Sequence, residues 1–279
     1  MADTQSVVYG LAFGRNIMQL AQQKYAKLLP LVYMKPNVVG KAFFQDQIGE
    51  WSMAVKAGRN SQTPNNDPAL ARRMGLMVDY HDNRLLDRGD ELKTISDPRS
   101  AYTIAAAASL GRQIDDVIIA AATGTAYSGE TGATSVTNGN IVLATAASLT
   151  LARIAAVKKA FDDADVEMED RAFIISTTAL SSLLQQDKVA SADYASVKAL
   201  VRGEIDTYMG FKFITTTRLA SGTVGIAVQK YGLCMAMAMA PMVKTDQRPD
   251  LSYSWQVYYA LSCGAVRLEE DRVVWVKEG

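Results

Sequence analysis

The sequence predicts a mixed α+β fold, and three patterns carry this prediction. An alanine-rich stretch near residues 98–122 has the composition of one long helix. Apolar and polar residues alternate within 42–80 and again from residue 236 onward, which is typical of strands with one apolar face. Between these regions, helical patterns alternate with short apolar strands over about 146–238, which indicates a compact α/β unit.

Composition restricts the class of protein. The chain has 279 residues, of which 49% are hydrophobic and 21% charged, so a sizeable core is expected and disorder is excluded. Lys plus Arg and Asp plus Glu each number 29, a zero balance that argues against a dedicated nucleic-acid binder and favours self-association. The start lacks the pattern of a secretory signal, and no stretch is long enough to span a membrane. Cys234 and Cys263 are therefore expected to be small buried thiols in a protein made in a reducing cytoplasm.

The first segment, residues 1–36, is basic and loosely amphipathic. Arg15 and Lys24 are two of four cations that face a single acid, and the helical spacing stops at Pro30 and Pro36. This pattern indicates an arm that needs a partner surface, while an ordinary packed first helix remains an alternative.

Residues 42–80 predict an extended β-hairpin. Trp51, Met53 and Val55 alternate with polar residues, and a second alternating run from Met74 ends at Tyr80, before His81. The stretch between them, 56–73, is polar and too long for an ordinary connection. Two strands alone are marginal in water, so the apolar face is expected to lie against the body of the chain or a neighbouring subunit.

The long helix at about 98–122 is the clearest element. Asp97 is a good N-cap, Pro98 suits the first helical position, and Gly124 supplies a stop. At 1.5 Å per residue such a helix spans roughly 35–40 Å, which makes it a structural axis.

Shorter elements follow in order. Residues 124–147 predict a loop or short hairpin with a turn at Asn138-Gly139. Helices are then expected at 149–162, around 180–184 and at 193–201; strands at 172–176, 210–217 and 224–228; and long closing strands at 236–246, 251–263 and 266–276.

The sequence offers no convincing catalytic, cofactor or metal site. His81 is the single histidine, and no Gly-x-Ser-x-Gly turn accompanies it. The glycine-rich stretch 124–139 lacks the lysine of a phosphate-binding loop, and the cysteines lack zinc-ligand spacing.

The acidic run 162–170 resembles the start of a calcium loop only superficially. Asp163, Asp165 and Glu167 alternate, but Met168 stands where the loop needs glycine. A solvated turn is the main interpretation. A docking site for basic groups of another subunit, or weak cation binding, stays open.

The order of these segments resembles the major capsid proteins of tailed bacteriophages, which have the Hong Kong 97 type fold. The stretches DDVIIAAATGTAYSG (115–129) and AVKKAFDDADVEMEDRAFIISTTALSSLL (156–184) look like the end of that fold's long helix and its helix, acidic turn, strand and helix. Its late segments are similar to GEIDTYMGFKFITTTRLA (203–220) and QVYYALSCGAVRLEEDRVVWVKEG (256–279).

The resemblance implies the organisation of the chain. It places an N-arm at 1–36, an extended hairpin called the E-loop at 37–80, a P-domain at 81–146 that contains the spine helix, an α/β A-domain at 147–238, and the closing strands of the P-domain at 239–279. Because the chain starts almost directly with the arm, the resemblance also implies a separate scaffolding protein.

The implied function is structural: self-assembly, as hexamers and pentamers, into the icosahedral head shell of a virion assembled in the bacterial host cytoplasm. Further implied partners are a portal, optionally a decoration protein, and packaged double-stranded DNA bound without sequence specificity; no enzyme activity, cofactor or membrane is implied. The alternatives are an encapsulin-like compartment and a soluble α/β enzyme. The residues expected at contacts between subunits are Arg15, Lys24, Trp51, Met53, Lys56, Arg59, Arg72, Arg73, Asp163, Asp165 and Glu167.

Overall fold

The computed structural model describes residues 22–63, 65–86, 99–144, 148–185 and 207–278. The first 21 residues of the predicted arm, with Arg15, the cap at Asp97 and the helix expected at 193–201 lie outside these residues. The described chain forms two compact units. The first contains 22–26, 79–86, 99–113 and 239–261, and the second contains all the other described residues.

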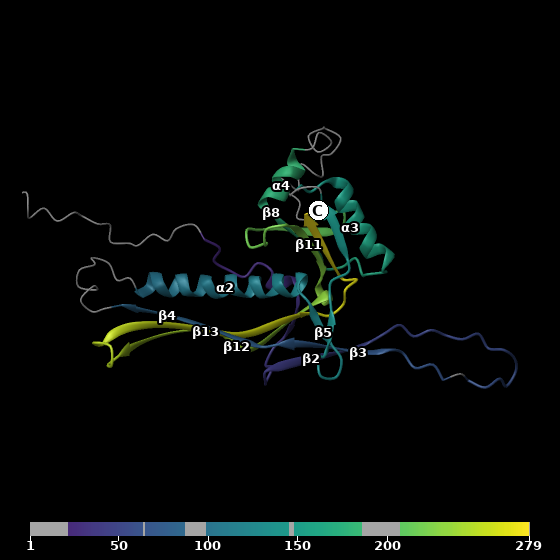
Figure 1. Ribbon diagram of the computed structural model, residues 1–279, viewed down its shortest axis with the longest axis horizontal. Helices are drawn as coiled ribbons and strands as arrows, with labels where there is room; N and C mark the ends of the chain where they lie inside the picture. The colour runs from purple at the N-terminus through teal and green to yellow at the C-terminus, as the bar shows by residue number, and fades with distance from the viewer. Residues whose placement is uncertain (1–21, 64, 87–98, 145–147, 186–206, 279) are drawn as a thin grey trace, which may run out of the picture. The chain divides into compact units, whose positions relative to one another are not determined.

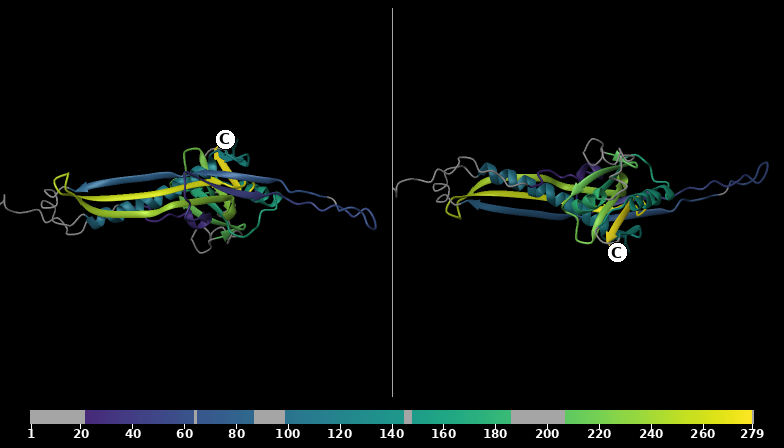
Figure 2. Two further views of the ribbon diagram at one scale, coloured as in Figure 1. Left: turned by 90° about the horizontal axis from the view of Figure 1, so that it is seen from below. Right: turned by 90° about the horizontal axis from the view of Figure 1, so that it is seen from above.

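The first unit combines one helix with long strands. These are the first half of α2 (Arg99–Thr123), β4 (Val78–Leu86) and the adjoining parts of β12 (Leu233–Arg248) and β13 (Ser254–Arg267). The strands run side by side in the order β12, β13, β4, and α2 runs along them (Figures 1 and 2). The long helix and the first two closing strands are thus confirmed, with bounds shifted by a few residues.

The second unit is built on a six-stranded sheet in the order β7-β14-β11-β8-β10-β9. Phe161, Phe173 and Phe211 are fully buried and meet at ring centroid distances of 5.5 and 6.0 Å in its core. The hydroxyls of Thr150 and Ser176 accept amide hydrogen bonds at the starts of the two helices, as N-caps do. The elements are β7 (Ile141–Ala144), α3 (Leu151–Asp163), β8 (Arg171–Ser176), α4 (Thr177–Leu184), β9 (Thr207–Tyr208), β10 (Phe211–Thr216), β11 (Thr223–Gln229) and β14 (Val273–Glu278).

A second sheet of this unit carries the hairpin, in the order β2-β3-β5-β6. Its strands are β2 (Ala42–Ile48), β3 (Leu70–Leu76), β5 (Ala126–Ser128) and β6 (Thr134–Val136). Phe43 is buried on one face, where a Cβ at Gly75 would lie only 2.3 Å from the Phe43 ring. Glycine is therefore required opposite this aromatic ring.

Short elements complete the unit. The 3₁₀ turn η2 (Leu29–Leu31) leads into β1 (Tyr33–Lys35), which pairs in parallel with β12 at Cys234–Ala236. A second 3₁₀ turn, η3 (Lys230–Gly232), joins β11 to β12.

Two hairpin predictions were wrong in detail. Residues 51–55 form no strand; the arms are β2 and β3, paired from Ala42–Leu76 to Ile48–Leu70, because those residues have a body to pack against. His81 does not end the second arm, since β4 is a separate strand in another sheet and His81 lies within it.

The turn expected at Asn138-Gly139 lies elsewhere. Strands β5 and β6 form the hairpin, and the turn between them contains Gly129 and Gly132, both with positive φ. Asn138 is instead buried, and its side-chain amide donates to the Ala122 carbonyl oxygen at 3.2 Å.

The last strand of the chain lies in the six-stranded sheet. Strand β14 pairs with β7 on one side and with β11 on the other in the six-stranded sheet. Val274 and Val276 of β14 are fully buried there, so core formation places the last strand in the α/β sheet.

Candidate inter-subunit contact surfaces

The hairpin tip, residues 49–69, exposes large apolar side chains. Trp51, Met53 and Val55 are 69%, 98% and 96% exposed. The backbone amide of Gly49 donates to the Ala69 carbonyl oxygen at 2.7 Å, and Asn66 donates to the Ser52 carbonyl oxygen at 2.9 Å. These hydrogen bonds join the two sides of the hairpin beyond the ends of β2 and β3. The tip is therefore a closed extension that exposes apolar side chains (Figure 1).

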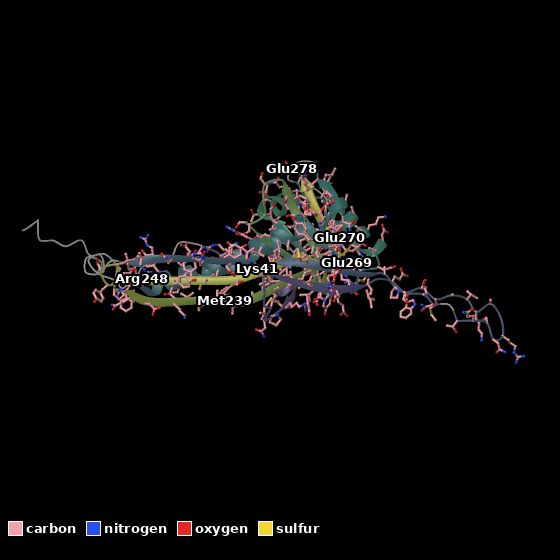
Figure 3. All side chains as sticks on the ribbon, turned by 60° about the horizontal axis from the view of Figure 1, so that its bottom comes forward. Lys41, Met239, Arg248, Glu269, Glu270 and Glu278 are labelled. Carbon is pink, nitrogen blue, oxygen red and sulfur yellow. The ribbon has the colours of Figure 1, made fainter. Side chains whose placement is uncertain are left out.

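Predicted contact residues gather on this tip. Lys56 and Arg59 are exposed, and a turn closes nearby, where the Ser61 amide donates to the Gly58 carbonyl oxygen at 3.4 Å. Figure 3 shows the side chains standing away from both sides of the extension. The combination of apolar and cationic groups suits contact with another protein surface.

The open face of the hairpin sheet continues this surface. Its exposed apolar residues come from β2, β3 and β5, and strand register brings them together: Phe44, Ile48, Leu70, Leu76 and Tyr127.

Arg72 and Asp46 form an ion pair in the middle of this face. The Nε–Oδ1 distance is 2.5 Å, and the guanidinium lies 5.6 Å from the centroid of the Phe44 ring. The hydrogen bond from Arg72 holds the pKa of Asp46 below its ordinary value. A concavity of about 610 Å³ opens beside the pair.

Arg73, predicted as a contact residue, points the other way. It is only 8% exposed; its Nη2 lies 2.6 Å from Glu270 Oε2, and its Nε donates to the Leu268 carbonyl oxygen at 2.9 Å. Alternation along β3 puts Arg72 and Arg73 on opposite faces, so Arg73 contacts its own subunit.

The acidic turn at 162–170 is largely neutralised within the chain. Arg171, 4% exposed, donates to Asp162 at 2.8 Å and to the carbonyl oxygens of Glu167 and Val166. Hydrogen bonds from Lys158, then from Arg171, lower the pKa of Asp162.

The three acids predicted as contacts are all on this turn. Asp163 pairs with Lys159 at 2.5 Å, and Glu167 pairs with Arg272, which lowers the Glu167 pKa. Asp165 is exposed with a left-handed φ of 51°. A solvated turn braced by a buried arginine is what the structure describes.

The segment from residue 22 to Leu28 is fastened along α2. Both carboxylate oxygens of the fully buried Asp115 accept backbone amides, from Lys27 and from Leu28, at 3.0 Å each. Lys24, a predicted contact residue, is exposed on this segment. Sequence patterns did not single out Asp115, because an acid in mid-helix ordinarily faces solvent.

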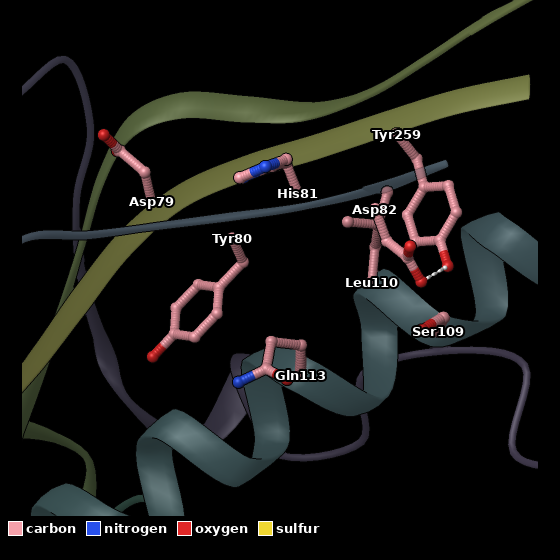
Figure 4. Close-up of a pocket in the computed structure, with 8 residues that line it drawn as sticks. All are labelled: Asp79, Tyr80, His81, Asp82, Ser109, Leu110, Gln113 and Tyr259. Carbon is pink, nitrogen blue, oxygen red and sulfur yellow. Dashed lines mark hydrogen bonds between the residues drawn. The ribbon is translucent and has the colours of Figure 1, made fainter. Parts of the chain in front are cut away.

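A polar pocket of about 350 Å³ lies between β4, β13 and α2 in the first unit (Figure 4). Tyr80 and Asp82 point toward α2, and the Tyr259 hydroxyl donates to Asp82 at 2.7 Å, which lowers the Asp82 pKa. His81 stands on the other side of the strand, away from Ser109. The serine and the histidine are therefore not paired.

Two further observations concern metal ions and membranes. Within the described ranges, no three His, Cys, Asp or Glu side chains are grouped to hold a metal ion. No helix among the described residues is both long and apolar enough to cross a membrane.

Taken together, the fold and its exposed tip define a subunit shaped for contact with other protein surfaces. The sequence profile described as "Phage capsid protein" matches residues 8–278. The chain therefore belongs to the phage capsid protein family.

Solved structures agree on the fold. The capsid of Cyanophage P-SCSP1u has 16% identity and a TM-score of 0.79, covering 98% of this chain and 94% of that one. The capsid of a native GTA particle has 12% identity and a TM-score of 0.77, covering 100% and 98%. The structure from Mycobacterium phage Che8 has 16% identity and a TM-score of 0.73, covering 96% of this chain and 97% of that one. No curated protein matches the sequence significantly.

The predicted α+β fold of the Hong Kong 97 type is thus confirmed, as is the prediction of a phage major capsid protein. The family places it in the virion capsid, and the encapsulin alternative is not favoured.

Proposed function

We propose that copies of this chain join as hexamers and pentamers into an icosahedral head shell around double-stranded DNA, with the hairpin lapping over a neighbouring copy as an E-loop. The observation that carries the proposal is the exposure of Trp51, Met53 and Val55 on a tethered extension. A free subunit would gain nothing from three large apolar groups in water, whereas a shell subunit can bury them.

The energetic scale supports this role. Burying one such side chain contributes about 1.5–3 kcal/mol, so full burial of all three side chains contributes about 5–9 kcal/mol to each contact. Repetition of one modest contact around a closed shell yields a durable particle, because each subunit is held by several neighbours at once.

The exposed face with Phe44, Leu70 and Tyr127 extends the proposed contact from the tip to the hairpin base. Its Arg72–Asp46 pair adds a polar centre that fixes orientation more than it adds affinity. We also propose contacts between subunits at the exposed cations Lys24, Lys56 and Arg59. A smaller acidic contact is proposed at Asp163, Asp165 and Glu167.

The remaining organisation and partners are also proposed. The N-arm at 1–36 reaches a neighbouring copy, the E-loop takes 37–80, and the A-domain forms around α3 and α4. A scaffolding protein, a portal and optionally a decoration protein complete assembly in the bacterial host cytoplasm. The chain acts structurally and not as an enzyme.

The test replaces the apolar tip. The triple variant Trp51→Ser, Met53→Ser, Val55→Ser is expected to fold normally, since these side chains are exposed, but to fail to form closed particles. Circular dichroism checks folding, and sedimentation velocity with negative-stain microscopy checks assembly. The matched control Ser61→Ala, Gln62→Ala, Thr63→Ala alters the same tip without removing large apolar groups, and we expect normal particles. Closed particles from the Trp51 triple variant at wild-type concentration would contradict the proposal.

A second measurement tests the scaffolding partner. Expression of the chain alone is expected to give soluble subunits or aberrant shells, and co-expression with the scaffold uniform ones. Uniform cages from the chain alone would contradict a required scaffold.

A further inference from the structure

One carboxylate lies between two buried arginines of the second unit. Glu270 Oε2 is 2.6 Å from Arg73 Nη2, and Glu270 Oε1 is 3.5 Å from Arg267 Nε. The side chains of Arg73, Arg267 and Glu270 are 10%, 0% and 25% exposed. Glu270 lies near the base of the hairpin (Figure 3).

Arg73 is the arginine that comes from the hairpin. It belongs to β3, and besides Glu270 it has the Leu268 carbonyl oxygen as acceptor. Its Nη1 is buried without a hydrogen-bond partner among the described residues. Glu270 is thus the counter-ion on which this buried hairpin cation depends.

Arg267 is the arginine that contacts the C-terminal end of α2. Its Nη1 donates to the carbonyl oxygens of Ala122 at 3.2 Å and Gly124 at 2.7 Å, and its Nη2 donates to Val136 at 2.9 Å. Carbonyl groups at the C-terminal end of a helix carry partial negative charge and lack helical partners, so a cation there caps α2.

The two guanidiniums repel each other, and burial disfavours both charges. Burial lowers the Arg267 pKa and Arg73 lowers it further, while Glu270 acts in the opposite direction. Removing the carboxylate would leave two like charges facing each other in a poorly hydrated site.

Two side-chain amides hold the backbone that carries the carboxylate. Asn140 donates to the Glu270 carbonyl oxygen at 3.0 Å, and Gln47 donates to the Leu268 carbonyl oxygen at 2.9 Å. The loop between β13 and β14 therefore offers the carboxylate from a fixed backbone.

We propose that Glu270 is a coupling residue that holds the base of the hairpin and the C-terminal end of α2 as one body. Loss of its charge releases both at once, although they belong to segments far apart in sequence. The coupling is a property of a single subunit, so it stands or falls independently of shell formation.

The test is hydrogen exchange on unassembled subunits. Glu270→Gln is expected to raise amide exchange at least tenfold both in β3, 70–76, and at the helix end, 119–124. Arg73→Gln is expected to raise exchange in β3 only, because Glu270 then still pairs with Arg267. Asp46→Asn, which removes the exposed pair on the opposite face, is the control and leaves the helix end unchanged.

Three outcomes would overturn the proposal: exchange in Glu270→Gln that rises at only one of the two segments, exchange that rises at neither, or equal increases at both segments in Arg73→Gln. If Glu270→Gln yields no soluble protein, Glu270→Asp is measured in the same way. Its carboxylate is one methylene shorter and withdraws from both guanidiniums, so the helix end and β3 are both expected to loosen.

Discussion

Replacing Asp115 by alanine tests how the segment before β1 is held to α2. The fully buried carboxylate accepts the Lys27 and Leu28 amides at 3.0 Å each, and alanine offers neither amide a substitute acceptor. A buried amide without a partner costs about 1–3 kcal/mol, so we expect Asp115→Ala to lower the free energy of unfolding by about 2–6 kcal/mol. Asp115→Asn keeps one acceptor oxygen, so its loss is expected to be about half as large.

The assay combines urea denaturation with hydrogen exchange at the two amides. We expect faster exchange at both in Asp115→Ala and at one in Asp115→Asn. An unfolding free energy within about 0.5 kcal/mol of wild type for Asp115→Ala, a change typical of surface sites, would refute this reasoning. Unchanged exchange at both amides would refute it equally.

Three further predictions concern the second unit. Gly75→Ala places a Cβ 2.3 Å from the Phe43 ring, so the free energy of unfolding measured in urea is expected to fall by about 1–3 kcal/mol; an unchanged value would show that the ring relaxes freely. Burial raises the pKa of Cys234 and of Cys263 to about 11, so thiol reagents at pH 8 are expected to modify them only after unfolding, and rapid labelling of the native subunit would disprove that burial. The pKa of Asp162 is lowered, so its contribution to stability is full above the ordinary value of 3.8 and is lost as pH falls through the lower native pKa. The variant Asp162→Asn is therefore expected to lose less thermal stability than the wild type below about pH 4. An acid stability profile identical to that of the wild type would contradict this prediction.

The sequence predicted the elements whose patterns are local. The helix expected at 98–122 is α2, Arg99–Thr123, because an alanine-rich run and a glycine stop are properties of the segment itself. The strands β8 and β11 were recognisable for the same reason, since each contains a short apolar run.

Other features depend on contacts that no local pattern records. Alternation at Trp51–Val55 indicated a strand, but without a neighbouring strand those residues stay exposed and irregular. The sequence did not reveal that β14 pairs with β7 and β11, because the choice of strand partners depends on tertiary contacts.

The candidate site was predictable in part. The long polar stretch 56–73 indicated an extended hairpin, and Lys56 and Arg59 on that stretch are exposed. Arg72 and Arg73 looked equivalent in sequence, yet alternation on β3 exposes one and buries the other. The buried partners Asp115, Arg267 and Glu270 carried no signal, since the residues they contact are distant in the chain.

Electron cryomicroscopy of particles assembled from this chain tests the central claim most directly. We predict closed shells in which Trp51, Met53 and Val55 of every subunit are buried against a second copy, so that the exposed fraction of Trp51 falls far below 69%. Shells in which the tip stays free in solvent, or folds back on its own subunit, would contradict the account.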